Sequence, residues 1–217
     1  MTLSRVRVAP RVTSYESEGA NVTTVLVVGA GPAGASAALR AAELGAHTVL
    51  VTSGAFGGMA ANDGPVPVRT LAHTARLIRD ARQLEQYGVV VGEPTLDYSR
   101  LLARVRQVVE DVSAQSFRRR DLDAMGATVH EHTGMARFLD AHTIETQSGL
   151  RLEADAIILC TGGVSRRLTV PGFELTNTHS DAWGLTSVPP SMLVVGGGDT
   201  GLQVASVFNA FGSRVQL

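Results

Sequence analysis

An apolar run that stops at a glycine-rich turn constrains the fold of this chain more than any other stretch. Residues 25–34 read VLVVGAGPAG, with glycines at Gly29, Gly31 and Gly34. A short apolar run bounded by glycine is typical of a strand that is buried on both faces of a parallel sheet. The sequence therefore predicts a buried strand before Gly29, a tight turn, and then a helix over 32–44.

The spacing of these glycines is that of a dinucleotide-binding turn. Gly29 permits the tight turn, Gly31 lets the backbone come close to a pyrophosphate, and Gly34 lets helix and strand pack closely. The helix that follows should present its unpaired N–H groups and the positive end of its dipole to that anion. A second apolar strand, predicted over 47–51, completes the start of a βαβ unit.

The same pattern appears again near the end of the sequence. Residues 192–212 read MLVVGGGDTGLQVASVFNAFG, and Gly196, Gly198 and Gly201 repeat the spacing of the first turn. Two copies indicate two nucleotide sites. This is the arrangement of an enzyme that passes electrons from one dinucleotide to another.

Composition and charge exclude several other classes of protein. The 217 residues are 44% hydrophobic and carry a net charge of -1, which gives no reason to expect nucleic acid or an acidic membrane surface as partner. Cys160 is the only cysteine, so no disulfide can form within the chain. No apolar run approaches the roughly 20 residues of a membrane span. We expect a cytoplasmic protein with a flexible lead-in over 1–23.

Periodicity and turn residues predict the elements between the two turns. Residues 52–67 are rich in glycine and proline, which indicates an irregular segment lying across the cofactor. Helices are predicted over 69–87 and 98–125, and the inward face of the second should carry Leu101, Leu102, Val105, Val108, Val109 and Val112. Short strands are predicted over 127–129, 136–139, 143–146, 150–152 and 154–159.

Polar clusters outside the turns indicate no catalytic or metal centre. His130 and His132 share a strand face, but no third ligand stands at a suitable spacing, so no metal site is predicted. Ser180 and Asp181 do not form a recognisable catalytic triad. The arginine run over 118–120 is interpreted as a solvated helix face rather than an anion site.

Taken in order, the motifs resemble the N-terminal half of the pyridine nucleotide-disulfide oxidoreductases, a family that includes dihydrolipoamide dehydrogenase and mercuric reductase. They are GAGPAG, GGMAANDGPVPVRTL, GMARF, ILCTGG, VPGFE and VVGGGDTG. The resemblance implies an α/β fold with a Rossmann-like FAD-binding domain of three β/β/α layers over 24–185. The start of a second Rossmann-like domain, for NADH or NADPH, should follow over 186–217. The implied reaction is reduction of a small-molecule electron acceptor through the flavin.

The same resemblance assigns binding residues one by one. For FAD they are the turn residues Gly29, Gly31, Pro32, Ala33 and Gly34, the loop residues Gly58 and Met59, the backbone of Ala136 beside the adenine, and Thr161 and Gly162. For the second nucleotide they are Gly196, Gly198, Asp199, Thr200 and Gly201. Asp199 stands where some relatives place an aromatic lid, so the nicotinamide pocket should be open or should repel phosphate.

Three departures from the family pattern bear on chemistry. Ala60 and Pro65 replace the redox-active cysteine pair, and thiol–disulfide exchange needs a thiolate that neither residue provides. Electrons should therefore leave the flavin for a quinone, a dye or oxygen, or not leave at all. Cys160, at an apolar strand end, is interpreted as a small buried residue rather than a redox thiol.

The second departure concerns the ribose and the third concerns the flavin. Thr52 replaces the glutamate that binds the adenosine ribose, so FAD should be held less tightly, or Ser53 should share the contact. Arg69 and Gln203 replace a lysine–glutamate pair beside flavin N5 and are the predicted catalytic residues. Because Arg69 keeps its charge while Gln203 removes the anion, we expect easier flavin reduction.

The sequence leaves three functions open. They are a FAD-dependent NAD(P)H:acceptor oxidoreductase without disulfide chemistry, a nucleotide-binding or redox-sensing module without turnover, and a first site adapted to another nucleotide. The position that separates NADH from NADPH, 18 residues after Gly201, lies beyond Leu217. The sequence thus resembles a truncation or one part of a split protein, without the dimerisation domain of homodimeric relatives, or else a short product with a new role. Residues 192–195 and 204–211 should then expose an apolar face.

Overall fold

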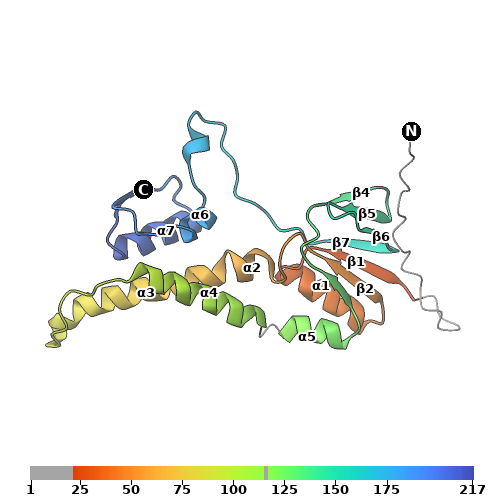
Figure 1. The fold of residues 1–217 in the computed structure, drawn as a ribbon, viewed down its shortest axis with the longest axis horizontal. Coiled ribbons are helices and arrows are strands. Elements are labelled where there is room, and N and C mark those ends of the chain that lie inside the picture. Colours follow the sequence, from red (N-terminus) through yellow and green to blue (C-terminus); the bar gives the residue numbers. More distant parts are fainter. Residues whose placement is uncertain (1–21, 115–116) are drawn as a thin grey trace, which may run out of the picture. The chain divides into compact units, whose positions relative to one another are not determined.

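The computed structural model describes residues 22–114 and 117–217, and these form two compact units. The first unit comprises residues 22–58 and 117–162, and the second comprises residues 59–114 and 163–217. The chain therefore enters each unit twice (Figure 1). The domain boundary predicted at residue 185 stays a prediction.

A four-stranded parallel sheet forms the centre of the first unit. Its order is β3-β2-β1-β7, made of β1 (Thr24–Val28), β2 (His47–Val51), β3 (Thr128–His130) and β7 (Ala156–Leu159). Helix α1 (Pro32–Glu43) connects β1 to its parallel neighbour β2, as a crossover connection requires. The predicted strand, turn, helix and second strand are confirmed.

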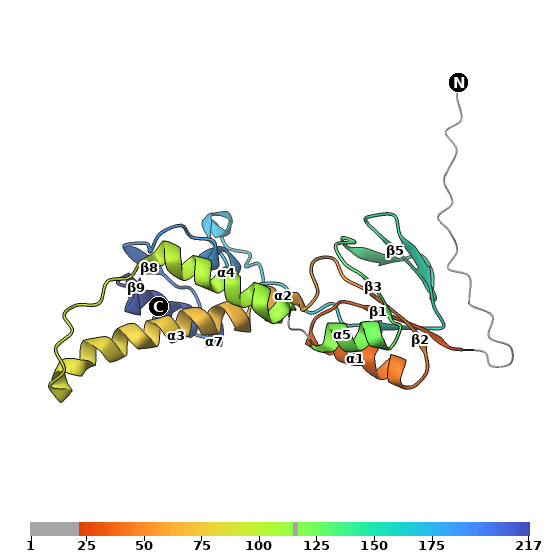
Figure 2. The ribbon, with the colours of Figure 1, turned by 60° about the horizontal axis from the view of Figure 1, so that its bottom comes forward.

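Two further layers cover the two faces of this sheet. Leu26 and Val28 pack with Ile144 and Leu152 of an antiparallel sheet made of β4 (Ala136–Phe138), β5 (Thr143–Thr146) and β6 (Arg151–Glu153). Val27 faces the other way and packs against α1 and against α5 (Phe117–Ala124), which lie side by side (Figure 2). Successive strand residues point to opposite faces, so one apolar run serves both layers. The predicted β/β/α architecture is confirmed.

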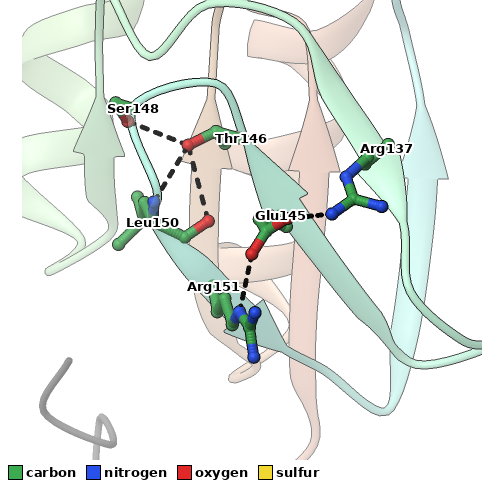
Figure 3. Close-up of polar contacts among 6 residues, drawn as sticks. All are labelled: Arg137, Glu145, Thr146, Ser148, Leu150 and Arg151. Carbon is green, nitrogen blue, oxygen red and sulfur yellow. Dashed lines mark hydrogen bonds and ion pairs between the residues drawn. The ribbon is translucent and has the colours of Figure 1, made fainter. Parts of the chain in front are cut away.

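The antiparallel sheet carries its own charged network on β5. Glu145 accepts hydrogen bonds from Arg151, at 2.7 Å, and from Arg137 on the other neighbouring strand (Figure 3). These two guanidinium groups, Arg151 first, lower the pKa of Glu145. The hairpin turn closes where the Leu150 N–H donates to Thr146 Oγ1 over 3.2 Å, as the figure also shows.

The second unit is mainly helical. Its elements include α3 (Pro65–Gln83), η1 (Leu84–Tyr87), α4 (Tyr98–Ala114), η2 (Phe173–Leu175), α6 (His179–Trp183), β8 (Ser191–Leu193), α7 (Asp199–Ala210) and β9 (Arg214–Gln216). Leu71 and Ala75 of α3, Leu101 of α4 and Phe208 of α7 share one core. Strand β8 pairs in parallel with β9. No helix in the described parts of the chain is long and apolar enough to span a membrane.

Two of the sequence predictions for the helices are wrong in detail. The segment 52–67, predicted to be irregular, contains the short helix α2 (Gly58–Asn62) and the start of α3. Pro65 opens α3 because the first helical residue needs no N–H partner. Residues 98–125, predicted to form one helix, include α4 and α5, which belong to different units, and residues 115–116 between them lie outside the described residues. Val112, predicted to face inward, is 41% exposed.

The prediction of an uncovered apolar face at the second glycine turn is wrong for the helix and confirmed for the strand. Val207 of α7 is 2% exposed and lies in a core that α3 and α4 also form. Leu193 at the end of β8 is 71% exposed, and Val195 is exposed as well. Long-range packing by α3 and α4 therefore covers α7, while the two-stranded sheet keeps apolar side chains at the surface.

Candidate dinucleotide-binding site

The first glycine turn is closed by backbone atoms at two positions and open at the third. A Cβ on Gly29, whose φ is +107°, would lie 2.1 Å from the carbonyl oxygen of Cys160. A Cβ on Gly34 would lie 1.7 Å from the carbonyl oxygen of Gly29. At Gly31 a Cβ would meet nothing within 4 Å. Only Gly31 therefore faces open space, as a residue that approaches a ligand should.

The N-terminus of α1 has no anionic partner from its own first turn. Its N-cap residue, Gly31, makes no side-chain cap, and the first turn holds no acidic residue. Arg118 of α5 donates to the Pro32 carbonyl oxygen over 2.9 Å and to Ser36 Oγ over 2.7 Å. A guanidinium beside the positive end of a helix dipole is unfavourable without an anion. This end of α1 is therefore arranged to receive a negative group.

The loop after β2 lies against the turn. Gly57 donates its N–H to the Ala30 carbonyl oxygen over 2.9 Å, and a Cβ on Gly58 would lie 2.9 Å from the Gly31 Cα atom. Only glycine fits at this approach, because the neighbouring atoms are backbone. The next residue, Met59, belongs to the second unit and is exposed.

The remaining predicted FAD residues lie at strand ends of the first unit. The Cys160 N–H donates to the Val28 carbonyl oxygen over 2.8 Å, which extends β7 beside β1 up to Thr161 and Gly162. Thr161 and Gly162 are exposed, whereas Cys160 is partly buried in the core with α1. Ala136 opens β4 and pairs with Thr146 of β5. The roles of these residues stay predictions.

Thr52, at the predicted ribose position, is almost wholly enclosed. It is 6% exposed. Its N–H donates to the His130 carbonyl oxygen over 2.9 Å, and its carbonyl oxygen accepts the N–H and the hydroxyl of Thr133, each over 3.1 Å. Ser53 is exposed. Thr52 thus offers little surface to a ligand.

Glu131, which directly follows β3, was missed by the sequence reasoning. One carboxylate oxygen accepts the Phe56 N–H over 2.7 Å, and the other pairs with Arg119. Arg119 also pairs with Asp123 over 3.1 Å and lies 6.0 Å from the centre of the Phe56 ring. Of the three arginines predicted to form a solvated face, Arg118 and Arg119 therefore have partners within the fold. The signal for Glu131 was its place one residue beyond a strand, next to Thr52.

The second glycine turn repeats the geometry of the first. Gly196 has a φ of +116°, and a Cβ on Gly201 would lie 2.0 Å from the Gly196 carbonyl oxygen. Gly198 is the N-cap of α7 and has open space around its Cα. Asp199, the first residue of α7, and Thr200 are exposed.

Comparison with known proteins places both turns in one family. The sequence profile described as pyridine nucleotide-disulphide oxidoreductase matches residues 23–217. The chain belongs to this family. The Rossmann-type fold predicted from the motifs is confirmed.

Similar proteins match this chain over less than half their own length. Dihydrolipoyl dehydrogenase 2 of Haloarcula marismortui is 36% identical over 203 residues, which are 89% of this chain and 42% of that protein. The Haemophilus influenzae dihydrolipoyl dehydrogenase is 33% identical, over 90% and 41% of the two chains. The solved structure of the HOCl-induced flavoprotein disulfide reductase RclA from Escherichia coli matches with a TM-score of 0.73 and 25% identity, over 88% and 41%. The chain thus spans about two-fifths of the length of these relatives.

The segment in which the resemblance places the family's cysteine pair contains part of α2, a turn and the start of α3. Ala60 lies within α2, and Pro65 is the first residue of α3. Between them, the Asp63 carboxylate accepts the Ser180 hydroxyl and lies 3.9 Å from His179 Nε2. Because serine and histidine both face one carboxylate, the histidine does not activate the serine, so this is not a nucleophile triad.

The predicted catalytic pair is joined by no hydrogen bond or ion pair among the described residues. Arg69 of α3 and Gln203 of α7 are both exposed. The two helices do meet elsewhere, where Arg79 donates to the Ser206 carbonyl oxygen over 3.2 Å. The assignment of Arg69 and Gln203 stays a prediction. Among the described residues no group of three or more His, Cys, Asp or Glu side chains is placed to hold a metal ion.

Proposed function

We propose that this chain belongs to a FAD-dependent oxidoreductase that takes hydride from NADH or NADPH and passes electrons to a non-disulfide acceptor such as a quinone. The observation that carries the proposal is Ala60 and Pro65 in the place of the family's cysteine pair, in a chain whose only cysteine is Cys160. Without a thiolate at that place, dithiol chemistry has no attacking group.

The geometry of the first turn fits the pyrophosphate of FAD. The N–H groups of Ala33 and Gly34 lie in the first turn of α1, and Gly31 leaves room for the ligand to approach. Arg118 adds a cation beside the same turn. When bound, FAD supplies two-electron chemistry that the protein side chains lack. The FAD-binding domain is proposed to span 24–185, with Gly58, Met59, Ala136, Thr161 and Gly162 beside the cofactor.

The second turn is proposed to bind the pyridine nucleotide, in a domain that begins at residue 186. The reasons are its matching glycine geometry and the family to which the chain belongs. Arg69 and Gln203 are proposed to set the field beside the flavin, with a net positive charge. An Arg69→Ala variant should then lower the flavin reduction potential. An unchanged potential would remove Arg69 from this role.

A nucleotide-binding module without turnover is the second candidate. The observation that favours it is Asp199 at the first position of α7, an acid at the helix end that would receive the second pyrophosphate. A weak second site would leave flavin binding without hydride transfer. Such a module would act as a redox sensor or as a nucleotide carrier.

An anaerobic visible spectrum of the purified chain, loaded with FAD and then treated with NADH or NADPH, tests these proposals. Bleaching of the flavin bands, followed by reoxidation with a quinone but not with oxidised lipoamide, is the expected result. Bands that persist after NADH and NADPH would indicate the binding module. If FAD leaves no bands on the gel-filtered protein, while another adenine nucleotide binds, the first site serves that nucleotide instead.

A further inference from the structure

A carboxylate stands next to the ribose position on the neighbouring strand. Strands β2 and β3 pair in parallel with Val51 opposite His130. The hydrogen bond from the Thr52 N–H to the His130 carbonyl oxygen continues this pairing by one step, which sets Glu131 opposite Thr52. Residues opposite each other on adjacent strands point to the same face of a sheet. Glu131 therefore projects from the same face of the sheet as a carboxylate at position 52 would, from the neighbouring strand.

The chain changes direction directly after Glu131. His132 has a φ of 56°, the only positive value at a non-glycine residue in the described parts of the chain. Its N–H donates to the Gly54 carbonyl oxygen, and the Thr133 N–H takes the next bond to Thr52. This extra residue resembles a bulge, a feature that re-aims side chains at sheet ends and is found beside ligand sites.

The carboxylate of Glu131 is oriented and still has acceptor capacity. The Phe56 N–H binds one oxygen and the Arg119 guanidinium binds the other. An ionised carboxylate has about four lone-pair positions, so each oxygen keeps one for a further donor. The Glu131 side chain is 29% exposed, in contrast to the enclosed Thr52.

The charges around Glu131 indicate which donor it receives. Arg119, Glu131 and Asp123 together carry one net negative charge, and Arg119 is already paired with both carboxylates. A ribose hydroxyl would donate to such a carboxylate, whereas a 2′-phosphate would be repelled. The cluster is therefore suited to a ribose with free hydroxyl groups, as in FAD.

We propose that Glu131, supplied by β3, binds a hydroxyl of the adenosine ribose at the first turn and takes the place of the carboxylate that β2 lacks. This inference rests on the proposed binding of FAD. It differs from the sequence expectation, in which Thr52 and Ser53 held the ribose.

The test compares FAD with its analogues that lack the 2′- or the 3′-hydroxyl of the adenosine ribose. Dissociation constants are measured by quenching of flavin fluorescence on the full chain. The unmodified chain should bind FAD at least about tenfold more tightly than one of the deoxy analogues, since hydrogen bonds to charged groups are strong. In Glu131→Gln this ratio should fall to near one, because natural FAD loses affinity and the deoxy analogue does not.

One further variant separates ribose binding from loop support. Asp123→Asn removes the other carboxylate on Arg119 and should keep the discrimination against the deoxy analogue. Melting curves of the ligand-free variants report any loss of folding.

The outcomes distinguish a failure of the Glu131–ribose contact from a failure of FAD binding. Discrimination that survives Glu131→Gln, or an equal loss of affinity for FAD and both analogues, overturns the role of Glu131 while FAD binding stands. An unmodified chain that binds FAD and both analogues alike also overturns it. A folded chain that does not bind FAD refutes the proposed function, and the ribose contact with it.

Discussion

The two glycine turns of this chain have the same internal geometry and different surroundings. In each, the first glycine has a φ above +100°, and the last glycine packs directly on its carbonyl oxygen. Gly29, however, is also walled in by the Cys160 carbonyl oxygen of the neighbouring strand, whereas a Cβ on Gly196 would meet nothing within 4 Å. The conformation of the turn is thus set by the local sequence. The close contact at Gly29 comes from the residue that follows β7, which is distant in sequence.

The helices that follow the two turns also differ in charge. The first turn of α1 holds no acid and carries Arg118 at its side, while α7 begins with Asp199. An acid at a helix N-terminus satisfies the dipole from within, and a bare N-terminus leaves that charge to a ligand. The first site is therefore the more strongly prepared of the two for an anion.

Replacement of the first glycine should give the largest effect on stability, and the two turns should differ in the size of that effect. Gly29→Ala should lower the free energy of unfolding by about 4 kcal/mol, because backbone strain and a collision with the Cys160 carbonyl act together. Gly196→Ala should cost only about 1 to 2 kcal/mol, from φ strain alone. Urea unfolding followed by circular dichroism measures both. Equal losses would show that the contact with the Cys160 carbonyl oxygen adds nothing to the cost of a side chain at Gly29.

The next prediction concerns the cation beside α1. Arg118→Gln should weaken FAD binding about tenfold and flatten its salt dependence, because a charge-assisted contact beside the helix N-terminus is lost. Arg120→Gln, which removes the same charge from an exposed neighbour in α5, is the matched control. Titrations at two salt concentrations distinguish them. If both variants behave alike, general charge rather than position explains the effect.

The core of the second unit contains a buried hydroxyl group. Tyr98, at the start of α4, has a buried hydroxyl with no hydrogen-bond partner in the described parts of the chain, and burial raises its pKa. Tyr98→Phe should stabilise the chain by about 1 kcal/mol, since an unsatisfied buried hydroxyl is removed while the ring contact with Phe211 stays. Thermal melting with Tyr87→Phe, an exposed tyrosine, as control reports the gain. A lower melting temperature would mean that the hydroxyl has a partner.

Local patterns in the sequence were enough for the parts of the fold near each turn. The run from β1 to β2 and the short strands of the antiparallel sheet follow from apolar periodicity and glycine, which act over a few residues. The inward face of α7 was predicted to be bare because the rest of a second nucleotide domain was expected to be missing. It is covered by α3 and α4, which lie about a hundred residues earlier in the chain. Periodicity carries no information about such a partner.

The candidate site divides in the same way. The glycines and the lost cysteine pair were visible as motifs. Glu131 was not, because its position beside Thr52 depends on the pairing of β2 with β3, which are about eighty residues apart. The Asp63 contact with Ser180 joins segments even further apart in sequence. Residues that reach a site through strand register or loop closure leave no spacing signal.

The smallest expected effect is on nucleotide affinity, and it tests whether the acid at the N-terminus of α7 weakens binding at the second turn. Asp199→Asn removes the acid from the first turn of α7, where it occupies the positive end of the dipole. NADH or NADPH should then bind about two- to threefold more tightly, because one negative charge near the pyrophosphate is gone. Calorimetric titration on the FAD-loaded chain measures this change. A weaker nucleotide affinity would instead make Asp199 a contact residue of the second site, so the two turns would bind their ligands by different means.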